Sequence, residues 1–133
     1  MQLNPYLIFN GDCEQALKFY EQTLGAKIEF LTRFAGSPAA EHAPSDWGDK
    51  VLHATMKIDG NVVMASDAPP GHYQKPQGVS ISISLNDSAK GESIFNALAE
   101  GGTTTMPFSK TFWASGFGMC TDRFGIPWMV NCE

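Results

Sequence analysis

The two halves of this sequence repeat one order of structural elements, and the repeat restricts the fold more than any other feature. Each half begins with a short apolar run, continues with an amphipathic segment that ends at glycine, and closes with further β-rich segments. Asp12 and Tyr20 are eight residues apart, as are Asp87 and Phe95. Self-similarity of this kind predicts a duplicated β-α-β-β-β module, at about residues 1–66 and 78–133, within one domain of 133 residues.

The first half shows each element of this order. Residues 6–9 (YLIF) are rich in strand-forming side chains. Asp12 is expected to cap the following helix, with Gln15 completing a capping box. The helix should end at Gly25, and an apolar stripe at helical spacing should be buried: Cys13, Ala16, Leu17, Tyr20 and Leu24. Strands are predicted at residues 27–34, 51–58 and 61–66, with a long loop rich in Ala, Pro and Gly at 35–50.

The second half begins after a loop at residues 67–78. Residues 79–85 (VSISISL) alternate apolar and polar side chains, which predicts a half-buried strand. Residues 86–88 should start a helix that ends at Gly101–Gly102 and carries Ile94, Phe95, Leu98 and Ala99. Three more strands are predicted at residues 103–112, 116–121 and 126–132.

The strand registers predict which side chains share a face. A tight turn at Asp59–Gly60 should pair position 57 with 62, 55 with 64 and 53 with 66. One face then holds His53, Thr55, Met64 and Ser66, and the other, which should pack on a helix, holds Leu52, Ala54, Met56, Ile58, Val63 and Ala65. In the second half the helix side takes Val79, Ile81, Ile83, Trp128 and Val130, and the opposite side takes Ser80, Ser82, Ser84, Met129 and Asn131. We therefore expect an α+β fold whose sheets curve around a cavity, with one pocket built from both modules.

Composition excludes several classes of protein. The net charge is −5 and no cluster of Lys and Arg occurs, which argues against binding to nucleic acid or anionic membranes. No run of 18 apolar residues and no signal-peptide pattern is present, so we expect no membrane span or secretion. Cys13, Cys120 and Cys132 lack a CxxC pair, which is typical of free thiols in a reducing cytoplasm.

Three stretches carry a resemblance to a known family: NPYLIFNGDCEQALKFYEQTLGA near the start, HATMKIDGNVVMASDAPP in the middle and FWASGFGMCTDRFGIPWMVN near the end. With the paired modules, they resemble the vicinal oxygen chelate superfamily, which includes glyoxalase I, bleomycin- and fosfomycin-resistance proteins and extradiol dioxygenases. The match is with its PhnB-like branch, also labelled 3-demethylubiquinone-9 3-methyltransferase-like, and covers nearly the whole chain outside residues 35–50. The resemblance implies a homodimer.

Catalytic members of the superfamily hold a divalent metal with His, Gln and Glu. The resemblance transfers those ligand positions to Pro5 or Tyr6, Met64, Ser80 and Met129, none of which supplies a carboxylate or an imidazole. We therefore predict no cofactor, because the standard metal ligands are absent, and a divalent metal held by other residues is the alternative. The methyltransferase label has no support in the residues either, because Gly11 stands alone where a cofactor-binding enzyme of that class has a glycine-rich loop.

His53 is the only histidine on a predicted strand. Its functional interpretation is a general base, a hydrogen-bond donor to a ligand or one ligand of an unusual metal site; the alternative is a histidine hydrogen-bonded within the sheet. His42 and His72 fall in loops and are expected to be solvated. Cys120 is expected to pair with Pro127 and face the cavity, either as a reactive thiolate or as an inert buried thiol.

The last motif combines a turn with aromatic residues. Asp122 and Gly125 suit a four-residue turn in which Asp bonds the local backbone and Gly takes a positive φ. Phe112, Trp113 and Phe117 either line the mouth of the cavity and stack on a flat ligand, or form a dimer contact or plain core. Asn131 is the strongest polar anchor for a ligand. The predicted ligand-binding set is His53, Thr55, Met64, Ser66, Ser80, Ser82, Trp113, Phe117, Met129 and Asn131.

The sequence thus predicts a cytoplasmic protein that binds a small organic ligand without the standard metal site. Two alternatives stay open. One is an atypical lyase, isomerase, transferase or oxygenase whose catalytic candidate is His53. The other is a resistance protein of the bleomycin type that sequesters a drug.

Overall fold

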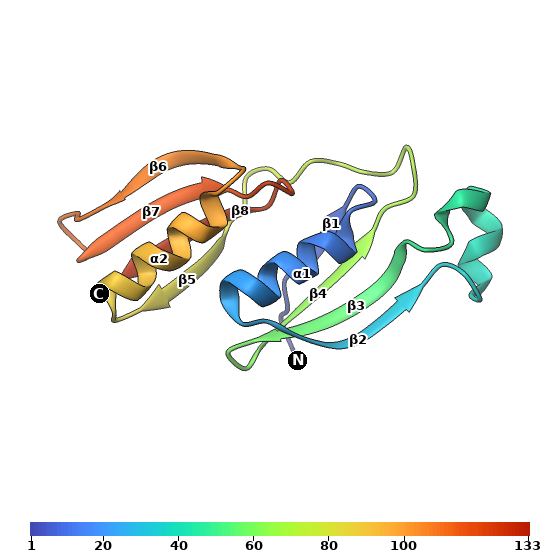
Figure 1. Ribbon diagram of the computed structural model, residues 1–133, viewed down its shortest axis with the longest axis horizontal. Coiled ribbons are helices and arrows are strands. Elements are labelled where there is room, and N and C mark those ends of the chain that lie inside the picture. Colours follow the sequence, from blue (N-terminus) through green and yellow to red (C-terminus); the bar gives the residue numbers. More distant parts are fainter. The chain divides into compact units, whose positions relative to one another are not determined.

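The structure, a computed structural model, describes residues 1–133 as two compact units, Met1–Gln74 and Lys75–Glu133. Each unit contains a four-stranded sheet with one α-helix packed on one face (Figure 1). The α+β class and the two tandem β-α-β-β-β modules are therefore confirmed.

The first unit follows the predicted element order closely. It comprises β1 (Tyr6–Phe9), α1 (Cys13–Leu24), β2 (Lys27–Arg33), β3 (Val51–Ile58) and β4 (Asn61–Asp67). The sheet order is β1-β4-β3-β2, with β1 parallel to β4. The hairpin register is confirmed, because Thr55 pairs with Met64 and Lys57 with Val62. The predicted loop between β2 and β3 contains two short 3-10 helices, η1 (Pro38–His42) and η2 (Ser45–Trp47).

The core of the first unit lies between α1 and one face of its sheet. The predicted stripe Cys13, Ala16, Leu17 and Tyr20 is buried, Phe19 joins it, and Leu24 is only half-buried. The sheet contributes alternate buried residues: Leu7, Phe9, Ala54, Met56, Val63 and Ala65. Burying a large apolar side chain of this kind stabilises a fold by about 1.5–3 kcal/mol. Leu52 departs from the predicted face and is half-exposed, because a register shift near its position places Arg33 opposite Val51.

The expected capping box at the start of α1 is wrong. The Asp12 side chain makes no capping hydrogen bond, and the helix N-terminus is instead served by Asp67, which lies at the end of β4. Asp67 Oδ1 accepts from the backbone N–H groups of Gly11 and Cys13, each at 2.9 Å, and its Oδ2 accepts from Val51 N at 2.9 Å. Asp67 is 3% exposed, so these charge-assisted bonds are buried. The Asp67 carboxylate at the end of β4 is therefore hydrogen-bonded to both the start of β3 and the N-terminus of α1.

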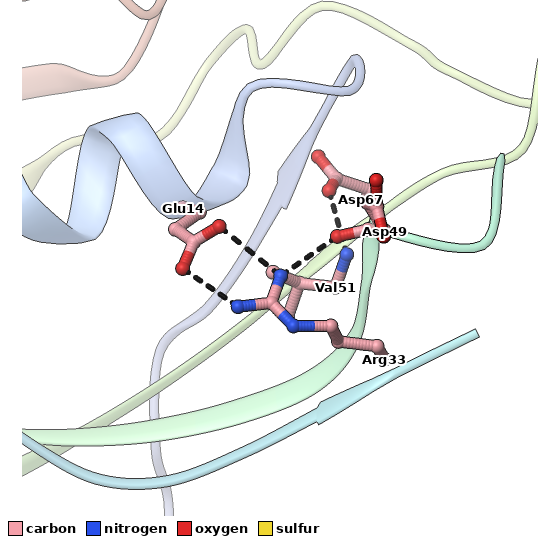
Figure 2. A network of polar contacts seen from close by, with 5 residues as sticks. All are labelled: Glu14, Arg33, Asp49, Val51 and Asp67. Carbon is pink, nitrogen blue, oxygen red and sulfur yellow. Dashed lines mark hydrogen bonds and ion pairs between the residues drawn. The ribbon is translucent and has the colours of Figure 1, made fainter. Parts of the chain in front are cut away.

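A second polar contact joins α1 to the end of β2. The Arg33 guanidinium forms a bidentate pair with Glu14, with N···O distances of 3.1 and 2.8 Å, and also donates to the Asp49 carbonyl at 2.8 Å. Figure 2 shows Arg33 between these two partners, with Asp67 and Val51 nearby. The hydrogen bond from Arg33 lowers the pKa of Glu14. Both side chains are partly exposed, at 40% for Arg33 and 34% for Glu14, so water weakens the ion pair and it contributes little to stability.

The second unit repeats the first. It comprises β5 (Ile81–Leu85), α2 (Ser88–Ala99), β6 (Thr103–Ser109), β7 (Gly116–Thr121) and β8 (Pro127–Cys132), in the sheet order β5-β8-β7-β6. Asp87 caps α2 by accepting from Lys90 N at 3.0 Å. Ile81 pairs with Trp128 and Ile83 with Val130, as predicted. Val79 lies before β5 and is 72% exposed, so its predicted place on the helix side is wrong.

The predicted partner of Cys120 is also wrong by one residue. Cys120 pairs with Trp128, and Thr121 pairs with Pro127. The reason is a longer turn: Asp122 N donates to the Ile126 carbonyl, so five residues rather than four connect β7 and β8. Cys120 therefore points to the same side as Trp128, where both are buried.

Candidate functional site

Each sheet has a face that its helix does not cover, and we call these the helix-free faces. On the first unit, one row of paired residues crosses all four strands: Tyr6, Met64, Thr55 and Phe30. Residues opposite each other on neighbouring strands point to the same side, so the row forms one continuous strip. Tyr6 and Phe30 are exposed, and Met64 and Thr55 are half-buried. The strip offers a phenol, a thioether, a hydroxyl and an aromatic ring.

The second unit carries the equivalent row. Ser82 lies opposite Met129, Met129 opposite Met119, and Met119 opposite Met106. A register shift in β2 between Ile28 and Phe30 has a counterpart in β6 between Thr104 and Met106. Each shift leaves one residue of the edge strand without a partner on the neighbouring strand, and the residue after it lies on the helix-free face. The duplicated module thus keeps its bulge as well as its order of strands.

His53 lies beside the first row and is held from both sides. Its Nδ1 is 3.1 Å from Tyr6 Oη and its Nε2 is 3.4 Å from Thr55 Oγ1. The rings of Tyr6 and Phe30 approach the imidazole, with centroid separations of 5.7 and 6.3 Å. Both ring nitrogens therefore have partners within the sheet, which is the arrangement expected of a positioned histidine. A catalytic role for His53 stays a prediction.

A second row on the second unit combines an amide with aromatic rings. Asn131 lies between Ser84 on β5 and Phe117 on β7. Its Oδ1 atom is buried and has no hydrogen-bond partner. Trp113, in the loop between β6 and β7, meets Phe117 edge to face at 5.3 Å, and Phe112 meets Trp113 in the same way at 4.8 Å. Phe112 is 97% exposed and Trp113 is 51% exposed.

The structure places most of the predicted ligand-binding residues on these faces. His53, Thr55, Met64 and Ser66 share the helix-free face of the first unit, where Ser66 pairs with Ile8. Ser82, Phe117, Met129 and Asn131 share that of the second unit, and Trp113 contacts Phe117 from the loop. Ser80 precedes β5, and Ser82 is the residue that lies opposite Met129. The predicted ligand contact of Ser80 stays a prediction.

Sequence reasoning missed three members of the rows: Phe30, Met106 and Met119. Met119 could have been found, because it alternates with buried Gly118 and Cys120 along β7. Phe30 and Met106 follow the bulges, and no sequence signal marked those bulges. Tyr6 was considered only as a transferred metal position, although the alternation of buried Leu7 and Phe9 places it on the helix-free face.

The residues at the transferred metal positions do not fit a hard divalent cation. Register equivalence makes these positions Tyr6, Met64, Ser82 and Met129. Their donor atoms are a phenol, a hydroxyl and two thioethers, whereas Mg²⁺, Mn²⁺ and Zn²⁺ take carboxylate, imidazole or thiolate ligands. No group of three His, Cys, Asp or Glu side chains is arranged elsewhere to hold a metal ion.

The cysteines are poor nucleophile candidates. Burial, with help from the Asp122 charge, raises the pKa of Cys120 to about 11. Burial likewise raises the pKa of Cys13, where Asp67 adds to the effect, and of Cys132. Because the thiolate is the reactive form, these thiols are inert near neutral pH. The reactive interpretation of Cys120 is therefore not supported.

The surfaces outside the helix-free faces carry none of the predicted ligand-binding residues in a hollow. An open hollow runs along the outer side of α2, lined by Ser88, Ala89, Glu92, Ser93 and Asn96, and it includes none of the predicted residues. His42 and His72 lie exposed outside the sheets, as expected. Neither helix combines the length and apolar character needed to cross a membrane.

Comparison with solved structures identifies proteins that share this fold. A glyoxylase/bleomycin resistance protein/dioxygenase domain from Frankia sp. EAN1pec is 15% identical, with a TM-score of 0.70, over 100% of this chain and 97% of that one. At that identity the likeness shows the fold alone. The paired modules thus define a protein of the vicinal oxygen chelate fold class.

The family described as 3-demethylubiquinone-9 3-methyltransferase matches residues 1–131, and the chain belongs to this PhnB-like family. Protein YjdN from Escherichia coli K12 is 37% identical over 139 residues, which cover 98% of this chain and 95% of YjdN. The crystal structure of protein PA1353 from Pseudomonas aeruginosa is 48% identical, with a TM-score of 0.89, over 100% of this chain and 98% of that one. The suspected family is confirmed.

Proposed function

We propose that this protein binds a small, moderately polar organic molecule on the helix-free faces of its sheets, without the superfamily's standard metal site. The observation that carries the proposal is the row Tyr6–Met64–Thr55–Phe30 with His53 beside it. Aromatic rings, a thioether and hydroxyl groups supply apolar contact and a few fixed polar groups, which is the usual make-up of a small-molecule site.

The polar groups of this cluster are already fixed in place. The contacts of Tyr6 and Thr55 with His53 restrict the imidazole before any ligand arrives. A restricted side chain loses little conformational freedom on binding, and this favours affinity. Tyr6 Oη keeps further hydrogen-bonding capacity beyond its contact with His53, because a phenol both donates and accepts.

The proposal is tested by equilibrium dialysis of the purified chain against a mixture of small organic metabolites, with mass spectrometry of the retained compounds. We expect at least one compound to be retained by the wild type and lost from Tyr6→Ala and His53→Ala. Gln15→Ala, a substitution on the exposed side of α1, is the control and should retain it. A compound retained equally by all four proteins, or no retained compound, contradicts the proposal.

Metal dependence needs a separate experiment. We expect metal analysis to find no stoichiometric metal, and Ni²⁺, Zn²⁺, Mn²⁺ and Mg²⁺ to leave the unfolding temperature unchanged at modest excess. Stabilisation by several degrees would show specific binding to the native state. That result would replace this proposal with an enzyme that uses an atypical metal site.

The remaining expectations stand as parts of the same proposal. We place the protein in the cytoplasm, and the three free, buried cysteines support a reducing compartment. We propose a homodimer, which sedimentation equilibrium tests: a monomer at micromolar concentration contradicts it. Catalysis through His53 predicts that His53→Ala abolishes turnover of a retained compound while the fold persists, and an unchanged rate would remove that alternative.

A further inference from the structure

We infer that the second unit holds a subsite for a neutral, planar ring that carries an N–H donor, formed by Trp113, Phe117 and Asn131. This inference rests on the proposed function and gives the class of ligand. Its first element is the amide. Asn131 Oδ1 is buried and accepts no hydrogen bond, although buried polar atoms of folded proteins almost always have a partner. A ligand that donates a hydrogen bond would therefore satisfy the Oδ1 acceptor of Asn131.

The second element is the aromatic pair next to that amide. Phe117 lies directly opposite Asn131 across the β7–β8 pair, so their side chains leave the sheet on the same face. Trp113 meets Phe117 edge to face at 5.3 Å, and it remains half-exposed. A ring placed on this pair gains stacking contact on the sheet face that also carries the Asn131 side chain.

The third element is charge. The two rows of this face, Ser82–Met129–Met119–Met106 and Ser84–Asn131–Phe117–Ser109, contain no ionisable side chain. An ionic ligand would lose hydration here without gaining a partner of opposite charge. A neutral ring with one or two polar edge atoms matches the lining better, and a lactam or a similar N–H next to C=O presents such an edge.

Two matched probes test the donor directly. 2-Quinolone is planar and carries a lactam N–H, and 1-methyl-2-quinolone has the same ring system without the donor. We expect calorimetric titration to show that 2-quinolone binds the full chain about tenfold more tightly, the effect of one buried hydrogen bond. Asn131→Leu should remove that difference, and Trp113→Ala should weaken both probes.

Asn96→Leu is the control, because it makes the same substitution on the exposed side of α2 in the same unit. It should leave both affinities unchanged. Equal affinity for the two probes, a failure of both to bind, or a loss caused by Asn96→Leu would overturn the inference. If dialysis still retains a compound that requires Tyr6 and His53, the proposed function survives and only this subsite fails.

Discussion

The Trp128 indole Nε1 donates a hydrogen bond of 2.9 Å to Asp122 Oδ2, and both residues are buried. The other carboxylate oxygen, Oδ1, accepts from Phe124 N at 2.8 Å and Ile126 N at 3.0 Å. The predicted bonding of Asp122 to the backbone of its own turn is confirmed. Asp122 also accepts the hydrogen bond of the buried Trp128 indole, which is the largest side chain in the core of the unit. The same carboxylate therefore takes part in both the turn and the core.

We predict that Asp122→Asn destabilises the protein by about 1–3 kcal/mol. An amide has one acceptor oxygen in place of two, so either the indole or the turn N–H groups lose a buried partner. Urea denaturation measures the change. Asp59→Asn, in the exposed β3–β4 turn where φ is 48°, is the control and should change stability by less than about 0.5 kcal/mol. Equal losses in the two variants would contradict the assigned role of Asp122.

Trp128→Ala should cost about 3–5 kcal/mol, because Trp128 is 1% exposed and is the largest fully buried side chain. Trp113→Ala removes the same side chain from a half-exposed loop position and should cost much less. Thermal and urea unfolding of the two variants provide the comparison. A larger loss for Trp113→Ala would show that the loop aromatics belong to the core.

A close approach between α2 and β8 makes Gly91 necessary. A Cβ atom added at Gly91 would collide with Cys132 Sγ, and Gly91 is buried. Gly91→Ala should therefore destabilise by about 1–3 kcal/mol, as overpacked core positions do. Adding Cys132→Ala to that variant removes the obstructing sulfur and should recover part of the loss. A double variant that is no more stable than Gly91→Ala would contradict this explanation.

Asp12 offers a test by pH. Burial raises the pKa of Asp12 above its ordinary value of 3.8, and the charge of Asp67 adds to the increase. A raised pKa means that the folded state favours the protonated acid, so this group's contribution to stability is complete below about pH 3.8 and falls as pH rises through the folded-state pKa. Asp12→Asn removes the charge and keeps a side chain of the same size. We expect the variant to unfold at a higher temperature than wild type at pH 7, and the difference to vanish near pH 3. A lower unfolding temperature at pH 7 would show that the charge is stabilising.

Sequence patterns were sufficient for the elements and for most of the faces. Alternation and turn chemistry act locally, so the Asp59–Gly60 turn was enough to give the pairing of Thr55 with Met64. The pairing of Ile81 with Trp128 was likewise correct. Asn131 was placed on the helix-free face by the same parity argument.

Sequence patterns failed where one residue was inserted or where a partner came from far along the chain. The bulges in β2 and β6 move Phe30 and Met106 to the helix-free faces, and a fifth residue in the β7–β8 turn moves Cys120 to the core. A single inserted residue reverses a strand's faces, because its side chains alternate with a period of two. Asp67 caps α1 across more than fifty residues, and local capping rules favoured Asp12 instead.

The central claim, binding on the helix-free faces, is tested most directly by NMR of the chain labelled at its methionine methyl groups. Met64, Met119 and Met129 lie on the helix-free faces, whereas Met56 is buried on the helix side of the first sheet. Titration with the compound retained in dialysis should shift the methyl resonance of Met64 or Met129 and leave that of Met56 in place. A shift confined to Met56, or no methionine shift at saturating compound, would contradict the account.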